Sequence, residues 1–258
     1  RDRTNMKENQ TTVTKQETLA ALRHPGELYV IMSAATKMPF VFCDEETYDD
    51  EVFLYYRMED AQNKAKELSD RKYKTGVAKL NEKVLLGFYT SLYTLGVNCL
   101  AVNAGTDTAI NIQLPDLVIR KNQTEDGKKV LENPELHLTA LYFMQELRKL
   151  PSPEMTDEMK EMQEELLAHY QKGTYILAME EDGQLPVLKQ KDGSMFLPIF
   201  TDILELNKFA KGKKMKVTAV PAQKIPQVLF PEAKGVVINP MGANVQLRVA
   251  RAKKPTEQ

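Results

Sequence analysis

The stretch Phe196-Leu197-Pro198-Ile199-Phe200-Thr201-Asp202 runs from an apolar, strand-like segment into the start of a helix. A second apolar block, Gly235-Val236-Val237-Ile238-Asn239, follows it. Both blocks have counterparts in the first half of the chain, at Phe53-Leu54 through Glu59 and at Asn98 through Asn103. Tyr175-Ile176-Leu177 likewise matches Tyr29-Val30-Ile31. Because related segments recur in the same order, we predict two related structural units in one polypeptide.

The C-terminal copy predicts an antiparallel meander followed by a helix. Asp182-Gly183 and Asp192-Gly193 separate three short apolar segments and favour type I′ hairpin turns. We expect Tyr175, Val187 and Phe196 in the core of this meander. Asp202, with Glu205 three residues later, is placed to cap a short amphipathic helix that ends near Gly212. A strand, a second short helix and two final strands complete the copy.

The N-terminal copy predicts the same order with longer insertions. A helix over residues 15–22 precedes it, and a helix over 59–68 follows its third strand. Asn81 is expected to cap a longer helix with Val84, Phe88, Leu92 and Leu95 on one face. The predicted strands cover residues 28–32, 40–43, 52–56, 73–80, 97–102 and 109–114.

Between the copies, the pattern predicts two helices separated by Pro151-Ser152-Pro153, with Asn133-Pro134 as N-cap and first-turn proline of the first helix. Apolar residues recur at helical spacing, which favours core packing, although methionines on such a face are also typical of an adaptable partner groove. These residues are Leu136, Ala140, Phe143 and Leu147, then Met155, Met159, Met162 and Leu166. The predicted class is α+β: related units at residues 14–122 and 173–252, each a mostly antiparallel or mixed sheet with two helices, joined by a helical pair at 133–172.

Composition excludes several classes of function. The 258 residues are 42% hydrophobic and carry a formal net charge of -1, so no overall positive field attracts nucleic acid or anionic lipid. No apolar run approaches the roughly 20 residues that span a bilayer, and the first dozen residues lack the apolar centre of a secretory signal. We therefore expect a cytoplasmic protein. Cys43 and Cys99 lie in apolar segments and are expected to be buried, reduced thiols.

Gly173-Thr174-Tyr175, the Asp-Gly turn, the stretch Phe196 through Asp202 and the block Gly235 through Pro240 together resemble the SseB family, named for enhanced serine sensitivity. The resemblance covers residues 173 to about 250 and is weak over 28–122. It implies an intracellular bacterial protein made of SseB-like α+β units, without an established enzymatic role and without a catalytic motif to transfer. In the weaker half Tyr55 stands in place of Pro198, and Met58-Glu59 in place of Thr201-Asp202, so a ligand site there is expected to be lost or altered.

No assembled chemistry stands out from the residues. His24, His137 and His169 are scattered, and each is expected at the surface or at a helix end, with His169 paired to Glu165. The acidic run Asp44 through Glu51 lacks the glycine of an EF-hand loop and predicts a solvated hairpin loop. We therefore predict no catalytic residues, no metal site and no cofactor.

The remaining candidate is the turn Asn239 through Asn244, with its counterpart Asn103 through Asp107. Tight-turn chemistry accounts for these residue types, and ligand binding on a loop is the alternative. Tyr175, Asp202, Asn239 and Gly242 are the speculative ligand-binding residues. We expect a non-enzymatic binding or regulatory protein, whose partner is another cytoplasmic protein or a second copy of the chain. The alternative is a small-molecule-binding protein or enzyme with a site between the two units.

Overall fold

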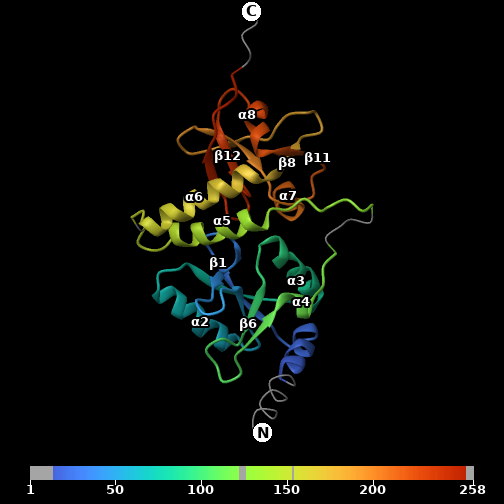
Figure 1. Cartoon of the computed structure of the whole chain (residues 1–258), viewed down its shortest axis with the longest axis vertical. Helices are drawn as coiled ribbons and strands as arrows, with labels where there is room; N and C mark the ends of the chain where they lie inside the picture. Colours follow the sequence, from blue (N-terminus) through green and yellow to red (C-terminus); the bar gives the residue numbers. More distant parts are fainter. Residues whose placement is uncertain (1–13, 122–125, 153, 254–258) are drawn as a thin grey trace, which may run out of the picture. The chain divides into compact units, whose positions relative to one another are not determined.

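The computed structural model describes residues 14–121, 126–152 and 154–253, and it confirms the α+β class. The chain divides into two compact units. Unit 1 comprises residues 1–122 and 148–153, and unit 2 comprises residues 123–147 and 154–258. Unit 1 is coloured mainly blue to green in Figure 1, and the strands of unit 2 orange to red. The helical pair predicted between the two copies falls in unit 2.

Unit 1 is built on a seven-stranded mixed sheet. The main path is β2-β1-β4-β6-β7, while β3 pairs with β4 and β5 pairs with β1. β4 and β6 are parallel, and the other pairs are antiparallel, as the predicted mixed sheet requires. The strands are β1 (Tyr29–Ser33), β2 (Met38–Pro39), β3 (Val41–Cys43), β4 (Asp50–Tyr55), β5 (Thr75–Lys79), β6 (Cys99–Val102) and β7 (Ile110–Gln113).

The helices of unit 1 cover residues 14–23, α2 (Met58–Asp70), η1 (Glu82–Val84), α3 (Leu85–Thr94) and α4 (Leu114–Leu117). α2 buries Ala61 and Leu68 in a cluster with aromatic residues of β1 and β4. The predicted cap at Asn81 is wrong, because its side chain makes no capping hydrogen bond. The chain first forms a 3-10 turn there, so Val84 precedes the α-helix and is 50% exposed.

Unit 2 contains a four-stranded sheet of order β13-β12-β10-β9 and a two-stranded sheet of order β11-β8. Ile176 and Phe200 exchange backbone hydrogen bonds of 2.9 and 3.1 Å, which connects the two sheets. β10 and β12 are parallel. The strands are β8 (Thr174–Met179), β9 (Leu188–Lys189), β10 (Met195–Ile199), β11 (Lys216–Pro221), β12 (Ala233–Ile238) and β13 (Val245–Arg248).

The helices of unit 2 are α5 (Pro134–Leu147), α6 (Asp157–Lys172), α7 (Ile203–Ala210), η2 (Ala222–Lys224) and α8 (Ile225–Val228). α5 and α6 pack against each other (Figure 1). The expected core role is confirmed for Leu136, Ala140, Phe143, Met159 and Leu166, which are all buried. Leu147 and Met162 are half-buried. Met155 is exposed because it precedes α6.

The predicted meander in the C-terminal copy is wrong. β8 pairs with β11 along its whole length, and among the described residues β9 pairs only with β10. The two Asp-Gly turns are not type I′, since Gly183 and Gly193 have φ of 84° but neither aspartate has positive φ. Val187 precedes the two-residue β9 and is 45% exposed, so its predicted core role is also wrong. Tyr175 and Phe196 are buried, as predicted.

The two units share one scheme of strand pairing. The antiparallel pairs β1–β5, β3–β4 and β6–β7 of unit 1 correspond in order to β8–β11, β9–β10 and β12–β13 of unit 2. The parallel pair β4–β6 likewise corresponds to β10–β12. A common topology is what a duplication would produce, whereas common ancestry itself stays a prediction.

The two cysteines differ in environment. Cys99 is buried and free, as expected, but Cys43 is exposed at the end of β3, so its predicted burial is wrong. Cys43 is the last residue of β3, where it pairs with Asp50 beside the mostly exposed loop over residues 44–49. In the described parts of the chain, no helix has both the length and the apolar composition needed to cross a membrane.

Candidate functional site

Asp202 and Asn239 meet at the start of α7 in unit 2. The Asp202 carboxylate caps α7 by accepting a hydrogen bond from the Glu205 amide at 3.1 Å, which confirms the predicted cap. Thr201 Oγ1 donates to the other oxygen of Asp202 at 2.7 Å. Asn239 Oδ1 accepts from the Thr201 amide at 3.0 Å, and its Nδ2 donates to Thr201 Oγ1 at 2.9 Å. Asn239 therefore joins the end of β12 to the turn between β10 and α7.

Gly242 belongs to the same group for a steric reason. A Cβ atom added at Gly242 would lie 2.8 Å from Oε2 of Glu205. The glycine thus leaves the space that the buried Glu205 carboxylate occupies. Tyr175, the fourth predicted residue, lies elsewhere: its hydroxyl donates to the Tyr170 carbonyl at 2.7 Å, and the two rings stack at 5.3 Å.

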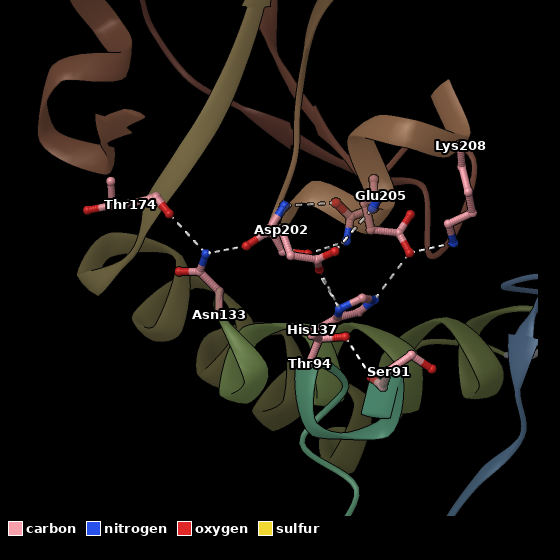
Figure 2. Close-up of polar contacts among 10 residues, drawn as sticks. Ser91, Thr94, Asn133, His137, Thr174, Asp202, Glu205 and Lys208 are labelled. Carbon is pink, nitrogen blue, oxygen red and sulfur yellow. Dashed lines mark hydrogen bonds and ion pairs between the residues drawn. The ribbon is translucent and has the colours of Figure 1, made fainter. Parts of the chain in front are cut away.

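His137 is the residue of this cluster that sequence reasoning placed wrongly, since it is 1% exposed rather than at the surface. Figure 2 shows the imidazole pointing from α5 toward Asp202 and Glu205. Nδ1 lies 3.5 Å from Asp202 Oδ2, and Nε2 lies 3.8 Å from Glu205 Oε1. A signal existed, because His137, Leu141 and Met144 form a second helical row, and all three are buried.

The other two histidines behave as predicted. His24 is exposed and lies 3.0 Å from Glu82. His169 lies 3.2 Å from Glu165, one helical turn earlier, which confirms the predicted pair. Neither residue belongs to the polar cluster of unit 2.

Lys208 and Asn133 extend the cluster of unit 2 in two directions (Figure 2). Lys208 Nζ lies 2.5 Å from Glu205 Oε1. The lysine side chain is partly exposed, so it links the buried Glu205 carboxylate to the surface. Asn133 Nδ2 donates at 2.9 Å to the carbonyls of both Thr174 and Thr201. The residue before α5 therefore holds β8 and the start of α7 together, beyond its predicted position as N-cap.

Two opposing effects set the pKa of Asp202. Burial raises it, whereas the hydrogen bond and charge of His137, the Thr201 hydroxyl and the Glu205 amide lower it. The lowering effects prevail, and the pKa lies below its usual value. Asp202 is therefore ionised at neutral pH and acts as a fixed acceptor.

This shift predicts an acid-sensitive contribution to the stability of unit 2. Because the pKa of Asp202 is depressed on folding, its contribution is complete above the unfolded value of about 3.9 and is lost as pH falls through the folded value. We expect the stability difference between the native chain and Asp202→Asn to be largest near pH 7 and to shrink below about pH 4. Urea titrations followed by circular dichroism at several pH values measure it. A difference independent of pH would contradict this assignment.

Unit 1 contains an equivalent turn. Asn103 has φ of 52° and Asn239 has φ of 50°. The Asn103 amide donates to the Leu54 carbonyl, as the Asn239 amide donates to that of Ile199. The Asn103 side chain accepts from the Tyr56 amide at 3.3 Å. The predicted counterpart relation of the two turns therefore corresponds to matching hydrogen bonds.

The detailed alignment of the two halves was wrong by two residues. Leu54 and Ile199 hold equivalent places, because each pairs with the residue just before the turn asparagine. Tyr56 then corresponds to Thr201, and Arg57 to Asp202. Arg57 and Asp202 are both N-cap residues of the helix that follows, α2 or α7. The error arose because apolar residues recur along both strands, so sequence matching alone did not fix the register.

The surface next to the Asn103 turn is hollowed. Three adjoining hollows of about 340, 390 and 320 Å³ all have Tyr56 in their lining. The first is lined by Tyr56, Arg57, Asp60, Asn103, Thr106, Asp107 and Thr108. The second also includes residues of the helix over 14–23. The Tyr56 hydroxyl is buried and has no hydrogen-bond partner in the described part of the chain.

The acidic run forms the loop between β3 and β4, as predicted, and Asp44 Oδ1 accepts from the amides of Glu46 and Thr47. Asp49, Glu51 and Cys99 come close enough to hold a metal ion, with ligand atoms within 4.8 Å of one another. Side-chain amides already occupy both carboxylates: Asn98 and Gln113 donate to Asp49, and Asn111 donates to Glu51. Burial raises the pKa of both Glu51 and Cys99, which disfavours the charged ligand forms.

Comparison with known proteins gives one family and two distant structures. Residues 154–251 match the family described as SseB protein N-terminal domain. Tic22 from Plasmodium falciparum is 13% identical over 85% of this chain and 90% of that chain, with a TM-score of 0.22. Anabaena Tic22 (protein transport) is 10% identical over 86% and 91%, with a TM-score of 0.20. TM-scores this low support no argument about fold or function. No curated protein matches significantly.

The family match covers β8 to β13 and α6, and therefore includes Asp202, Glu205, Asn239 and Gly242. His137 lies on α5, outside the matched range. The C-terminal half of this chain is thus similar to the SseB N-terminal domain, and α5 contributes a buried histidine from outside the matched range.

Proposed function

We propose that this chain is a non-enzymatic, cytoplasmic binding protein, and that its SseB domain presents a protein-binding surface formed by α7 and β11. The observation that carries the proposal is the closed polar cluster at the start of α7. The side chains of His137, Asp202 and Glu205 are at most 3% exposed and face one another. A substrate would have to enter the interior of unit 2 to reach these groups, and this holds also for His137 Nε2 and Glu205 Oε2, which make no hydrogen bond among the described residues.

The exposed side of the same helix has the composition of a contact surface. Ile203 and Leu204 in the first turn of α7 are 45% and 44% exposed. Val217 on β11 is 54% exposed. It pairs with Ala178, which belongs to the core cluster beneath α7, so Val217 lies on the α7 side of the β8–β11 ribbon. Exposed apolar groups on one side of a domain are typical of partner contacts.

Charge and backbone indicate the chemistry of the partner. Lysines follow α7 and continue into β11 at Lys211, Lys213, Lys214 and Lys216. β11 pairs only with β8 in the described residues, so its outer edge has backbone groups available for another strand. An extended, acidic segment with apolar anchors fits these features, by strand addition at β11.

A matched pair of variants tests this proposal. The full chain, immobilised, is expected to retain a stoichiometric partner from native lysate, which is identified by mass spectrometry and then titrated as a purified protein. Leu204→Glu with Val217→Glu should weaken binding by about tenfold or more, because both add a charge at an apolar contact. Val187→Glu is the control, since Val187 is 45% exposed but lies outside α7 and β11. Equal binding by all three proteins, or turnover by the purified chain, would refute the proposal.

A further inference from the structure

We infer that the acidic, solvent-facing side of α6 binds the lysine-rich segment of a second copy of this chain. The lysine segment comprises residues 208–216. The contact joins side chains and does not use the backbone edge of β11, so it goes beyond the partner binding proposed above and does not depend on it. The acidic face of α6 is defined by its exposed carboxylates, Asp157, Glu158, Glu161, Glu164 and Glu165.

The charges of unit 2 are separated along the sequence and in space. Residues 154–165 contain six acidic residues and one lysine, whereas residues 206–231 contain six lysines and no acidic residue. In Figure 1 the start of α6 lies at the left edge of unit 2, and β11 lies at the right. In the described part of the chain, no ion pair joins the two stretches. The two sets of charges therefore do not neutralise each other within one copy.

The acidic face of α6 is crowded by like charges. Glu161 lies one helical turn from Glu158, Glu164 and Glu165, and like charges at this spacing repel each other. Among the residues that the structure describes, Glu158, Glu161 and Glu164 have no ion-pair partner. Leu167 lies next to Glu164 on the helix surface and is 40% exposed. A positively charged partner would relieve the repulsion and cover this apolar side chain.

The lysine segment offers the complementary charge. Two of its five lysines pair with carboxylates of unit 2. The other three, Lys211, Lys214 and Lys216, are exposed and have no ion-pair partner within the described ranges. Lys214 shares a hollow with Glu181 and Asp182, so Lys211 and Lys216 carry the least compensated charge. Lys211 ends α7 and Lys216 begins β11, so regular elements hold both positions.

The overall charge permits association of identical copies. The formal net charge of the chain is -1, so two copies do not repel each other strongly as whole molecules. Patches of opposite sign on a nearly neutral molecule orient one copy against the next. Because each exposed ion pair contributes little by itself, the association depends on several pairs and is expected to be reversible and sensitive to salt.

Sedimentation equilibrium of the full chain measures this association. At about 0.1 M salt we expect the average mass to rise above the 29.3 kDa of one copy as the protein concentration increases. At about 1 M salt the screening length falls from about 10 Å to about 3 Å, and the dissociation constant should increase by about tenfold or more. The mass of a single copy at every concentration in low salt would overturn the inference, and so would association that salt does not weaken.

Charge reversal identifies the two faces. Glu161→Lys with Glu164→Lys reverses the acidic face, and Lys211→Glu with Lys216→Glu reverses the lysine segment. Each double variant alone should associate about tenfold or more weakly than the native chain. A mixture of the two should associate with native affinity, because the native lysine segment of the first variant then meets the native acidic face of the second. If mixing did not restore association, or if either variant alone associated as the native chain does, the assignment would be wrong.

A third double variant is the control for net charge. Glu45→Lys with Glu46→Lys makes the same change of charge in the exposed loop between β3 and β4, and should leave association unchanged within about twofold. Circular dichroism confirms that each variant is folded. If the loop variant weakened association as much as the α6 variant, net charge would be responsible, and the inference would fail. The α6 variant leaves α7 and β11 unaltered, so the partner binding proposed above should persist in it.

Discussion

Gly235→Ala is expected to destabilise unit 2 by about 3–5 kcal/mol, one of the two largest effects proposed for a single substitution in this chain. Gly235 has φ of 155°. It lies in β12 where the pairing with β10 shifts, since Met195 and Leu197 of β10 face Ala233 and Val236 of β12. An added Cβ would collide with the Leu247 carbonyl oxygen and would lie 2.7 Å from the Val249 nitrogen. Both are backbone atoms of the neighbouring segment, which cannot move without breaking the ladder.

Gly76→Ala is the matched control for this substitution. Gly76 also lies within a strand, β5, but has no atom within 4 Å of an added Cβ and does not have positive φ. Its replacement should leave stability unchanged or raise it by up to about 1 kcal/mol. Urea unfolding and hydrogen exchange in peptides from β10, β12 and β13 measure the effects. If Gly235→Ala were as stable as Gly76→Ala, the contact between the added Cβ and the Leu247 carbonyl would be relieved by a small backbone shift, contrary to this prediction.

Asp202→Ala is expected to cost about 3–5 kcal/mol, for a different reason. The substitution removes the cap of α7 and also removes the carboxylate beside the buried His137. The imidazole would then have lost its nearest acid, and the Thr201 hydroxyl would have lost its acceptor. Hydrogen exchange should increase first in α7 and in the turn after β12. Asp202→Asn keeps an oxygen for the cap and should cost less than the alanine variant.

Asp192→Ala is the control for removing an aspartate whose carboxylate is exposed rather than buried. Asp192 also accepts a backbone hydrogen bond, from Ser194 at 2.9 Å, but it lies in an exposed turn. Its loss should change the free energy of unfolding by at most about 1 kcal/mol. If Asp202→Ala were no more harmful than Asp192→Ala, the buried cluster would not hold α5 and α7 together. Alanine at position 202 therefore tests the packing of unit 2 as well as the helix cap.

Local signals in the sequence predicted most elements of the fold. Asp202 caps α7 as expected, because a cap depends on residues only three positions apart. The strands β8, β10 and β12 were also located from their apolar runs. Predictions failed where the partner was distant: β8 pairs with β11, about 40 residues later, although β9 follows it more closely in sequence. Hairpin signals describe a turn, and they do not select the strand that fills the neighbouring edge.

The candidate sites also combine residues that local signals identified with contacts that form only between distant segments. Asn239 and Gly242 were identified from their turn, but the reason for each lies in contacts with Thr201 and Glu205 that only the folded chain creates. His137 was expected at the surface, because its burial depends on which side of α5 unit 2 covers. The hollow at Tyr56 was also not foreseen, since it requires Asn103 and α2 to lie together.

By itself, the sequence determined the α+β class, the positions of most helices and strands, the cap at Asp202 and the resemblance to the SseB family. These features depend on periodicity, turn chemistry and short spacings, which are properties of neighbouring residues. The tertiary structure alone decided the partner of β8, the burial of His137 and the residues around Tyr56. Those features depend on contacts between distant segments, whose formation is governed by the packing of the whole unit rather than by any local preference.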